Sequence, residues 1–406
     1  MPAPRLVILT YYFPPDFAAG AFRMDAMVRA LRSRLPDCAR IDVVTAQPHR
    51  YKGQQAVDSV DGSLFGTNVA VHRLNARGLG GGSGSGLSHF ASFAIRAAHL
   101  VQRLRPDVIL GSSSRLGTAA LAAELARLTG ADLHLDMRDC LPDNFRALYP
   151  RAGGGVWGGG LNLLQWRTLR RARFISVTAP VYGRYLARHG QQQAIYWLPN
   201  GVDADFRRLG EASSVEGGVS GRVKRIVYAG NVGKGQALER ILPELAEQTQ
   251  GIAEWRIIGD GGSYKALQRL LNERQVGNVS LIPPQPRAML EGHYDWADVL
   301  FLHLSSARAM QRVIPSKFFE YAATGKPVVA GARGYLARFL RAQAAGVWCF
   351  PPGDAASAVQ CINAVDHIWY DRSRFRERFD RGALMRPFCD AFLDRFPVLL
   401  GEPSGK

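Results

Sequence analysis

Short apolar runs rich in β-branched residues alternate with helical patterns along almost the whole chain, and this alternation restricts the possible folds more than any other feature. The runs are apolar on both faces, which is typical of parallel strands covered by helices on both sides. In the first half we expect strands at residues 6–12, 41–46, 69–74, 108–112, 131–137, 174–179 and 194–198. The alternation therefore predicts a doubly wound parallel α/β sheet.

The alternation breaks once, at residues 199–201, and a polar stretch rich in Gly and Ser follows up to residue 221. It then restarts, with strands expected at residues 225–229, 255–259, 279–282, 299–303, 327–330 and 347–350. We therefore expect two α/β domains, over residues 1–199 and from residue 200 onward. Because open α/β sheets bind ligands at the carboxyl ends of their strands, we also expect a ligand-binding cleft between the domains.

Two glycine-rich segments interrupt the pattern in the first half, at residues 78–86 and 153–160. No strand-to-helix turn encloses the first segment, so it does not have the form of a phosphate-binding loop. The composition of both segments predicts loops.

The five cysteines are scattered and form no C-x-x-C pair. Such a set argues against a disulfide framework or a thiolate zinc site and favours a reducing compartment, so we expect a cytoplasmic protein. Nowhere does the chain have eighteen consecutive apolar residues, and the first apolar run lacks the length and cleavage site of a secretory signal. The sequence therefore predicts a protein that does not span a membrane.

The formal net charge of +17 is unevenly distributed, with +12 in residues 1–200 and +5 in residues 201–406. Basic surfaces attract nucleic acid, anionic lipid headgroups or polyanionic substrates through the same Coulomb attraction. A solvated surface of an arginine-rich protein is equally compatible with this excess. No zinc-finger, basic-zipper or RNA-recognition pattern is present, so we expect a membrane surface or a lipid phosphate as partner and no nucleic acid.

Glycine turns follow three of the expected strands, around Gly20, at residues 230–235 and at residues 259–262. Residues 230–235 (GNVGKG) lie between a strand and an expected helix over residues 236–248, an arrangement that favours phosphate binding by Lys234 and backbone N–H groups. The spacing matches neither a Walker A loop nor a dinucleotide fingerprint. A plain turn at Gly20 and a solvated lysine at Lys234 remain alternatives.

A short helix is expected to begin just after Pro315, because proline favours the first helical turn and Gly325 follows the last one. Ser316 and Lys317 then lie in the first turn, where the helix dipole favours anions. Glu320 lies one turn further on, at a spacing suited to accept hydrogen bonds from a ribose diol while the first turn holds phosphate. An exposed helical carboxylate is the alternative for Glu320 alone.

Six motifs occur in a shared order that resembles family 4 glycosyltransferases with the GT-B fold, over nearly the whole chain: YYFPPDFAAGAFR, RDCLPD, PNGVD, YAGNVGKGQAL, IIGDGG and IPSKFFEYAATGKPVV. Within that family, the PSK motif most resembles bacterial surface-polysaccharide transferases, including N-acetylfucosaminyltransferases. The resemblance implies two Rossmann-like domains, residues 1–199 for the acceptor and 200–371 for the nucleotide sugar. It also implies a helical tail, residues 372–406, that crosses back to the first domain.

The resemblance further implies retaining transfer of a hexosyl or N-acetylhexosaminyl group from a nucleotide-diphosphate sugar, with UDP favoured over GDP. The acceptor would be a lipid-linked oligosaccharide of capsule, exopolysaccharide or lipopolysaccharide synthesis, at the inner face of the cytoplasmic membrane. Two alternatives stay open. One is a UDP-N-acetylglucosamine 2-epimerase of the same fold, and the other is a non-catalytic nucleotide-sugar-binding subunit of a synthase complex.

By resemblance, Gly20 and Lys234 contact the diphosphate, Glu320 the ribose, and Ser316 and Lys317 the sugar or the phosphates. The complete expected donor site comprises Gly20, Gly230, Asn231, Gly233, Lys234, Gly259, Asp260, Gly261, Pro315, Ser316, Lys317 and Glu320. The residues expected to act in catalysis are Lys234, Glu320 and Asp139.

Two positions depart from the pattern of the family. Many members carry a glutamate eight residues before Glu320, where this chain has Arg312, and some carry a histidine after the fifth strand, where it has Arg138 and Asp139. We expect Arg138 and Asp139 to bind the acceptor, with Asp139 contacting its hydroxyl or orienting Arg138. Pairing with Arg138 or capping of a helix is the alternative role for Asp139.

We expect no metal or other cofactor. Asp203-Ala204-Asp205 has the D-x-D form of a metal site in another transferase fold, but it lies at the linker, away from the other motifs. No His or Cys at ligand spacing completes a site around Asp136 and Asp139. The predicted activity is therefore independent of metal, and EDTA should not abolish it.

Overall fold

The structure is a computed structural model that describes residues 3–16, 18–48, 66, 68–75, 86–113, 115–138, 143, 155–188, 194–203, 206, 222–365 and 369–402. It divides into two compact units. Unit 1 comprises residues 1–199 and 382–406, and unit 2 comprises residues 200–381. Among the described residues, no helix combines the length and the apolar character that a membrane crossing requires.

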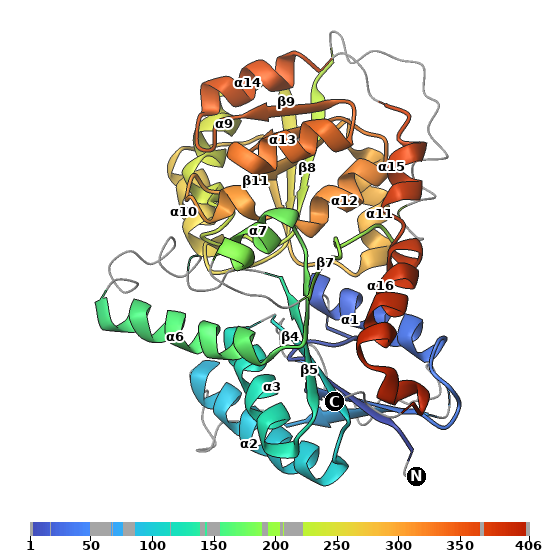
Figure 1. Cartoon of the computed structure of the whole chain (residues 1–406). Helices are drawn as coiled ribbons and strands as arrows, with labels where there is room; N and C mark the ends of the chain where they lie inside the picture. The colour runs from blue at the N-terminus through green and yellow to red at the C-terminus, as the bar shows by residue number, and fades with distance from the viewer. Residues whose placement is uncertain are drawn as a thin grey trace. The chain divides into compact units, whose positions relative to one another are not determined.

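Unit 1 is built on a parallel sheet of seven strands in the order β3-β2-β1-β4-β5-β6-β7 (Figure 1). The strands are β1 (Arg5–Leu9), β2 (Arg40–Ala46), β3 (Val69–Leu74), β4 (Val108–Ser112), β5 (Asp132–Met137), β6 (Phe174–Val177) and β7 (Ala194–Trp197). Five of its helices are α1 (Ala19–Arg32), α2 (Gly86–Leu104), α3 (Leu116–Thr129), α6 (Gly155–Arg171) and α7 (Pro180–Arg188). The strand order reverses at β1 and β4, as the doubly wound prediction requires.

Two sequence predictions for unit 1 were wrong in detail. The first strand ends at Leu9 rather than at residue 12. The glycine-rich residues 155–160, whose composition predicts a loop, form the first turns of α6. Glycine disfavours a helix by only about 1 kcal/mol per residue, which packing of the rest of α6 against α3 offsets.

The C-terminal tail completes the core of unit 1. Helix α16 (Arg381–Arg395) and the short helix η4 (Pro397–Leu400) place Phe388, Phe392 and Phe396 among the buried residues of β1, β2 and β4. The ring of Phe392 meets the buried His134 ring edge-on, with 5.4 Å between centroids. Residues 372–381 belong to unit 2, so the tail joins unit 1 ten residues later than the sequence suggested.

Unit 2 is built on a parallel sheet of six strands in the order β10-β9-β8-β11-β12-β13. The strands are β8 (Lys224–Ala229), β9 (Ala253–Ile258), β10 (Val279–Ile282), β11 (Val299–His303), β12 (Val328–Gly331) and β13 (Val347–Phe350). The helices described in unit 2 are η2 (Leu238–Arg240), α9 (Leu242–Gln248), α10 (Tyr264–Glu273), α11 (Arg287–Trp296), η3 (Met310–Arg312), α12 (Ser316–Ala323), α13 (Gly334–Gln343), α14 (Ala355–Asn363) and α15 (Ser373–Arg378).

The helix after β8 differs from the single helix expected over residues 236–248. The chain forms the short helix η2 and then α9, because Ala237 has a left-handed φ of 50° and Pro243 lies in the first turn of α9. Helix α12 begins at Ser316, directly after Pro315, as predicted.

We expect Phe392→Ala to destabilise unit 1 by about 3–5 kcal/mol, because it opens a cavity in the core shared by the tail and the sheet. Urea unfolding followed by far-UV circular dichroism measures this loss. Leu400→Ala is the matched control, since Leu400 in η4 is 41% exposed and its truncation should change stability by about 0.5 kcal/mol or less. Equal losses in the two variants would contradict the role given to the tail.

Candidate active site

The glycine turns after β8 and β9 touch at the carboxyl end of the sheet in unit 2. Gly230 has a φ of 148° and Gly259 one of 141°, values that residues with a Cβ rarely adopt. A Cβ on Gly259 would overlap the carbonyl oxygen of Gly230. The N–H of Gly230 donates to the carbonyl of Ile258 at 2.8 Å. Backbone therefore packs directly on backbone here, and both positions require glycine.

The side chain of Lys317 reaches this contact from the first turn of α12. A Cβ on Gly230 would overlap the Lys317 ammonium, which donates to the hydroxyl of Tyr228 at 2.7 Å. The ammonium also lies 3.9 Å from the centroid of the Tyr228 ring, a cation–π contact. Burial lowers the pKa of Lys317 to about 7, although Glu320 opposes the shift. A poorly solvated cation thus lies against the first glycine of the turn.

Glu320 lies one helical turn after Lys317. Burial raises the pKa of its carboxyl, and the positive charges of Arg287 and Arg381 partly oppose this. The hydroxyl of the buried Tyr294 donates to Oε2 of Glu320 at 3.4 Å. Burial also raises the pKa of Tyr294 well above its usual value, so the phenol keeps its proton and remains a donor.

Asp203, from the D-x-D triplet, lies between two arginines of unit 2. Its carboxylate forms ion pairs with Arg287 and with Arg381, the latter at 2.6 Å. The guanidinium of Arg287 also stacks on the ring of Phe206 at 4.4 Å. Asp205 lies outside the described residues. Within the described part of the chain, no three His, Cys, Asp or Glu side chains are grouped to hold a metal ion.

The turn that carries Lys234 is held by its own polar contacts. Asn231 donates from Nδ2 to Oε1 of Gln236 at 2.8 Å, and a Cβ on Gly233 would come close to that Asn231 amide. Lys234 itself is exposed. A Cβ on Gly261 would overlap the carbonyl of Val232, so the β9 turn packs against the β8 turn at a second point.

Asp260 accepts a hydrogen bond from the N–H of Gly261 at 2.7 Å, within the β9 turn. Its position at the end of β9 follows the sequence prediction. Arg312 ends the short helix η3, three residues before Pro315, so this arginine rather than a glutamate precedes α12.

His303, which was not predicted from the sequence, contacts the end of the turn that carries Lys234. Its Nδ1 contacts the carbonyl of Gln236 at 2.6 Å, and its Nε2 accepts from the N–H of Gly353 at 3.0 Å. Burial lowers the pKa of His303 to about 4, so the ring is neutral at physiological pH. The feature of the sequence that could have indicated this role is a histidine at the end of the otherwise apolar strand β11.

In unit 1, Gly20 and Arg138 lie together. Gly20 is in the first turn of α1, and a Cβ there would overlap Nη1 of Arg138. The Arg138 side chain therefore lies over the positive end of α1. The sequence predicts Gly20 in the donor site and Arg138 in the acceptor site, whereas the two residues are in contact. Asp139 lies outside the described residues.

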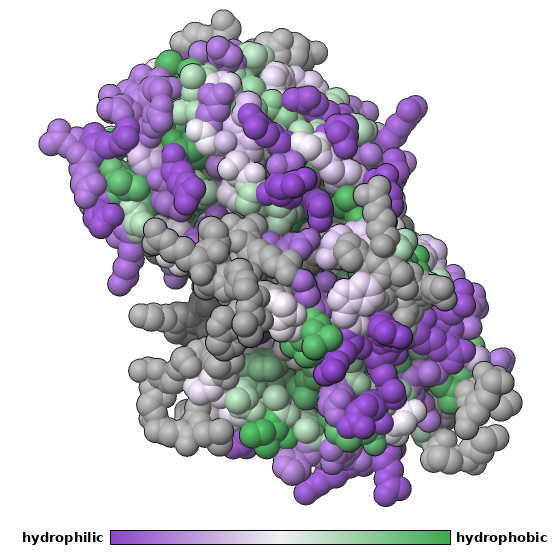
Figure 2. Space-filling model, turned by 60° about the vertical axis from the view of Figure 1, so that its left-hand side comes forward, coloured by the Kyte–Doolittle hydropathy of each residue, from purple (hydrophilic) through white to green (hydrophobic). Residues whose placement is uncertain are grey.

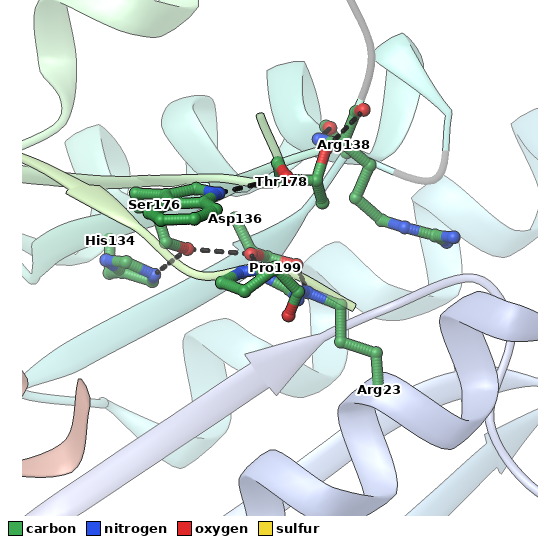
Figure 3. A network of polar contacts seen from close by, with 9 residues as sticks. Arg23, His134, Asp136, Arg138, Ser176, Thr178 and Pro199 are labelled. Carbon is green, nitrogen blue, oxygen red and sulfur yellow. Dashed lines mark hydrogen bonds and ion pairs between the residues drawn. The ribbon is translucent and has the colours of Figure 1, made fainter. Parts of the chain in front are cut away.

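A buried ion pair joins α1 to β5 next to that contact (Figure 3). Arg23 donates to both carboxylate oxygens of Asp136, at 2.8 and 2.7 Å, and to the carbonyl of Pro199 at 3.0 Å. Ser176 donates to Asp136 at 2.6 Å. Burial by itself raises the pKa of Asp136, but Arg23 and Ser176 outweigh it and the net shift is downward. The pair fixes α1, and thus Gly20, relative to the strand end that carries Arg138.

Two protein-family models match this chain. The Glycosyl transferase 4-like domain matches residues 21–201, and the Glycosyl transferases group 1 domain matches residues 223–365. Both matched domains are glycosyltransferase domains, and the chain is a member of family 4 of the glycosyltransferases. A protein of Escherichia coli strain K12 named as the colanic acid biosynthesis glycosyl transferase WcaI is 24% identical over 261 residues. That alignment covers 61% of this chain and 64% of WcaI.

Solved structures establish the fold. Sucrose-phosphate synthase from Thermosynechococcus elongatus superposes with a TM-score of 0.74 at 15% identity, covering 97% of this chain and all (100%) of that one. Anabaena HepE, solved in complex with UDP and glucose, gives a TM-score of 0.65 at 14% identity, covering 95% of this chain and 98% of that one. The predicted GT-B fold is confirmed.

We expect Gly259→Ala to displace the Gly230 turn, because the added methyl overlaps backbone and the residue must leave its positive φ. The thermal unfolding temperature should therefore fall. Gly262→Ala is the matched control, since a Cβ there meets nothing within 4 Å. The importance of the glycine contact is contradicted if both variants unfold at the temperature of the parent chain.

Proposed function

We propose that this chain is a retaining glycosyltransferase that moves a hexosyl or N-acetylhexosaminyl group from a nucleotide-diphosphate sugar to a lipid-linked oligosaccharide of surface-polysaccharide synthesis. One observation carries the proposal: the Lys317 ammonium lies against Gly230, at the carboxyl end of a parallel sheet, with the Glu320 carboxyl one turn away. A cation beside a glycine turn suits a diphosphate, and an adjacent carboxylate suits a ribose diol. Family membership supports the same chemistry.

The positive groups act on the leaving group. When the bond between the anomeric carbon and the phosphate oxygen breaks, negative charge grows on the nucleotide diphosphate. The oxygen of the acceptor hydroxyl bonds to that carbon, and its proton passes to an oxygen of the leaving diphosphate. Lys317 and Lys234 stabilise this charge. Preorganised donors of this kind contribute about 3–4 kcal/mol each to lowering a barrier.

In unit 1, Gly20 and Arg138 together offer N–H groups and a guanidinium to a single anion. A phosphate of the donor or of the lipid-linked acceptor matches this pair, with Asp139 next to Arg138 in the sequence. UDP is the favoured nucleotide, and HepE was solved with UDP. We further propose action without a metal, at the inner face of the cytoplasmic membrane, with no nucleic-acid partner.

The first test is a thermal-shift panel of UDP, GDP, ADP, TDP and NAD, each with and without EDTA. One nucleoside diphosphate, UDP in our proposal, should stabilise the protein equally with and without EDTA and should fail to stabilise Lys317→Ala. Stabilisation by NAD alone, or by no ligand, would show that the site is not a nucleotide-sugar site.

Turnover of UDP-sugars on a lipid-linked acceptor tests catalysis itself. Lys234→Ala and Glu320→Ala should each reduce kcat/KM by about a hundredfold, which corresponds to the loss of one stabilising contact. Full activity in both variants would remove these residues from the mechanism. Conversion of the UDP-sugar without any acceptor would point instead to the epimerase.

The affinity for UDP should fall as the pH rises above 7. In the free protein Lys317 loses its proton near that pH, whereas a bound diphosphate favours the charged ammonium, so binding becomes coupled to proton uptake. The dissociation constant should then rise by at most about tenfold per pH unit. Isothermal titration calorimetry in buffers of different ionisation enthalpy measures both effects. Lys317→Arg, which stays charged, should bind UDP with little pH dependence between pH 7 and 9.

A further inference from the structure

Three helices of unit 1 form one layer with an unusual surface. Helices α2 and α6 both pack against α3, and we call the three together the α2–α3–α6 layer (Figure 1). Its exposed large hydrophobic side chains are Ile95, Leu128, Leu163 and Leu164, each between 41% and 53% exposed. They make up four of the seven such side chains found among the described residues. Exposed aliphatic groups thus concentrate on this layer rather than scatter over the surface.

The same layer is strongly basic. It carries six exposed arginines and a single acidic residue, Glu124, which already pairs with one of them at 2.5 Å; the arginines are Arg96, Arg103, Arg127, Arg167, Arg170 and Arg171. The excess of positive over negative charge continues in the chain around α6, because residues 144–202 contain eight arginines and no Asp or Glu. Nearly half of the net charge of +17 therefore resides in this segment of 59 residues.

Helix α6 shows how the two properties combine. Leu163, Leu164, Arg167, Arg170 and Arg171 are exposed, while Gln165, Thr168 and Leu169 are buried. The exposed residues follow the three- and four-residue spacing of a single helix face, with leucines toward the N-terminus and arginines toward the C-terminus. Figure 2 shows the side of the molecule from which α6 projects. On that side, hydrophobic and strongly hydrophilic residues lie next to each other.

We propose that the α2–α3–α6 layer docks on the surface of an anionic lipid bilayer. This inference rests on the proposed function, because the acceptor proposed there is lipid-linked. Aliphatic side chains insert among the acyl chains at the interface, while arginines pair with lipid phosphates. Single-stranded nucleic acid is a poorer match, because its binding sites supply aromatic rings for base stacking. None of the exposed large hydrophobic side chains among the described residues is aromatic.

Vesicle co-sedimentation of the full chain tests the charge contribution. The probes are vesicles of phosphatidylglycerol mixed equally with phosphatidylcholine, and vesicles of phosphatidylcholine alone. The triple variant Arg167→Gln, Arg170→Gln, Arg171→Gln should lose about fivefold in affinity for the anionic vesicles per arginine removed, most strongly at low salt. The matched control replaces three exposed arginines of unit 2, Arg269, Arg338 and Arg374, and has the same net charge. It should bind as the parent chain does.

The apolar contribution has its own pair of variants. Leu163→Gln with Leu164→Gln should weaken binding to the anionic vesicles without changing its salt dependence. Met289→Gln, at a 57% exposed position of unit 2, should have no effect.

The thermal unfolding temperature reports folding for every variant. If the arginine triple variant folds poorly, the single substitution Arg167→Gln replaces it as a milder change.

Equal losses in the two arginine triples, or no binding of the parent chain to anionic vesicles, would overturn the docking surface. Binding to a single-stranded oligonucleotide but not to vesicles would assign the layer to nucleic acid instead. The UDP thermal shift, measured in the same variants, separates the two proposals. Vesicle binding without a UDP shift would reject the proposed function alone, and a UDP shift without vesicle binding would reject the docking surface alone.

Discussion

The close approach of two backbone turns, at Gly230 and Gly259, is the constraint on which the candidate donor site depends. Any side chain at Gly259 would overlap the Gly230 carbonyl, so β8 and β9 can end side by side only because both are followed by glycine. The absence of a side chain at Gly230 also leaves the space that the Lys317 ammonium occupies. Tyr321 of α12 reinforces the arrangement, since its hydroxyl accepts from the N–H of Ala229 at 2.8 Å. Two strands and one helix thereby meet at a single point.

Two buried cations of unit 2 are paired with backbone carbonyls rather than with opposite charges. Lys224 donates to the carbonyls of Ile362 and Val365, at 2.6 and 3.1 Å, just where α14 ends. Arg372 donates to the carbonyl of Ala345, and burial lowers its pKa to about 9. Both cations stabilise the negative end of a helix or the turn after it. Lys317 differs, because its partners are a phenol and an aromatic ring, which leaves the ammonium able to take an anion.

The fold followed from the sequence because its signals are local. Each strand is a short apolar run, and each predicted run corresponds to a strand, with ends shifted by a few residues. Helix α12 began where Pro315 indicated, because proline acts on the residues next to it. Where local signals conflicted, prediction failed. The glycines of residues 155–160 suggested a loop, yet packing against α3 draws them into α6.

The sequence by itself determined the two parallel sheets, the glycine turns and the membership of a transferase family, since these depend on residue type and order along the chain. Only the tertiary structure decided which side chains meet. It placed Arg138 over Gly20, which lies more than a hundred residues away, and it surrounded Asp203 with two arginines from distant segments. It also revealed His303 and Tyr294 as supports of the site. Such contacts arise from the packing of elements remote in sequence, where a long side chain can reach several partners and spacing along the chain does not select among them.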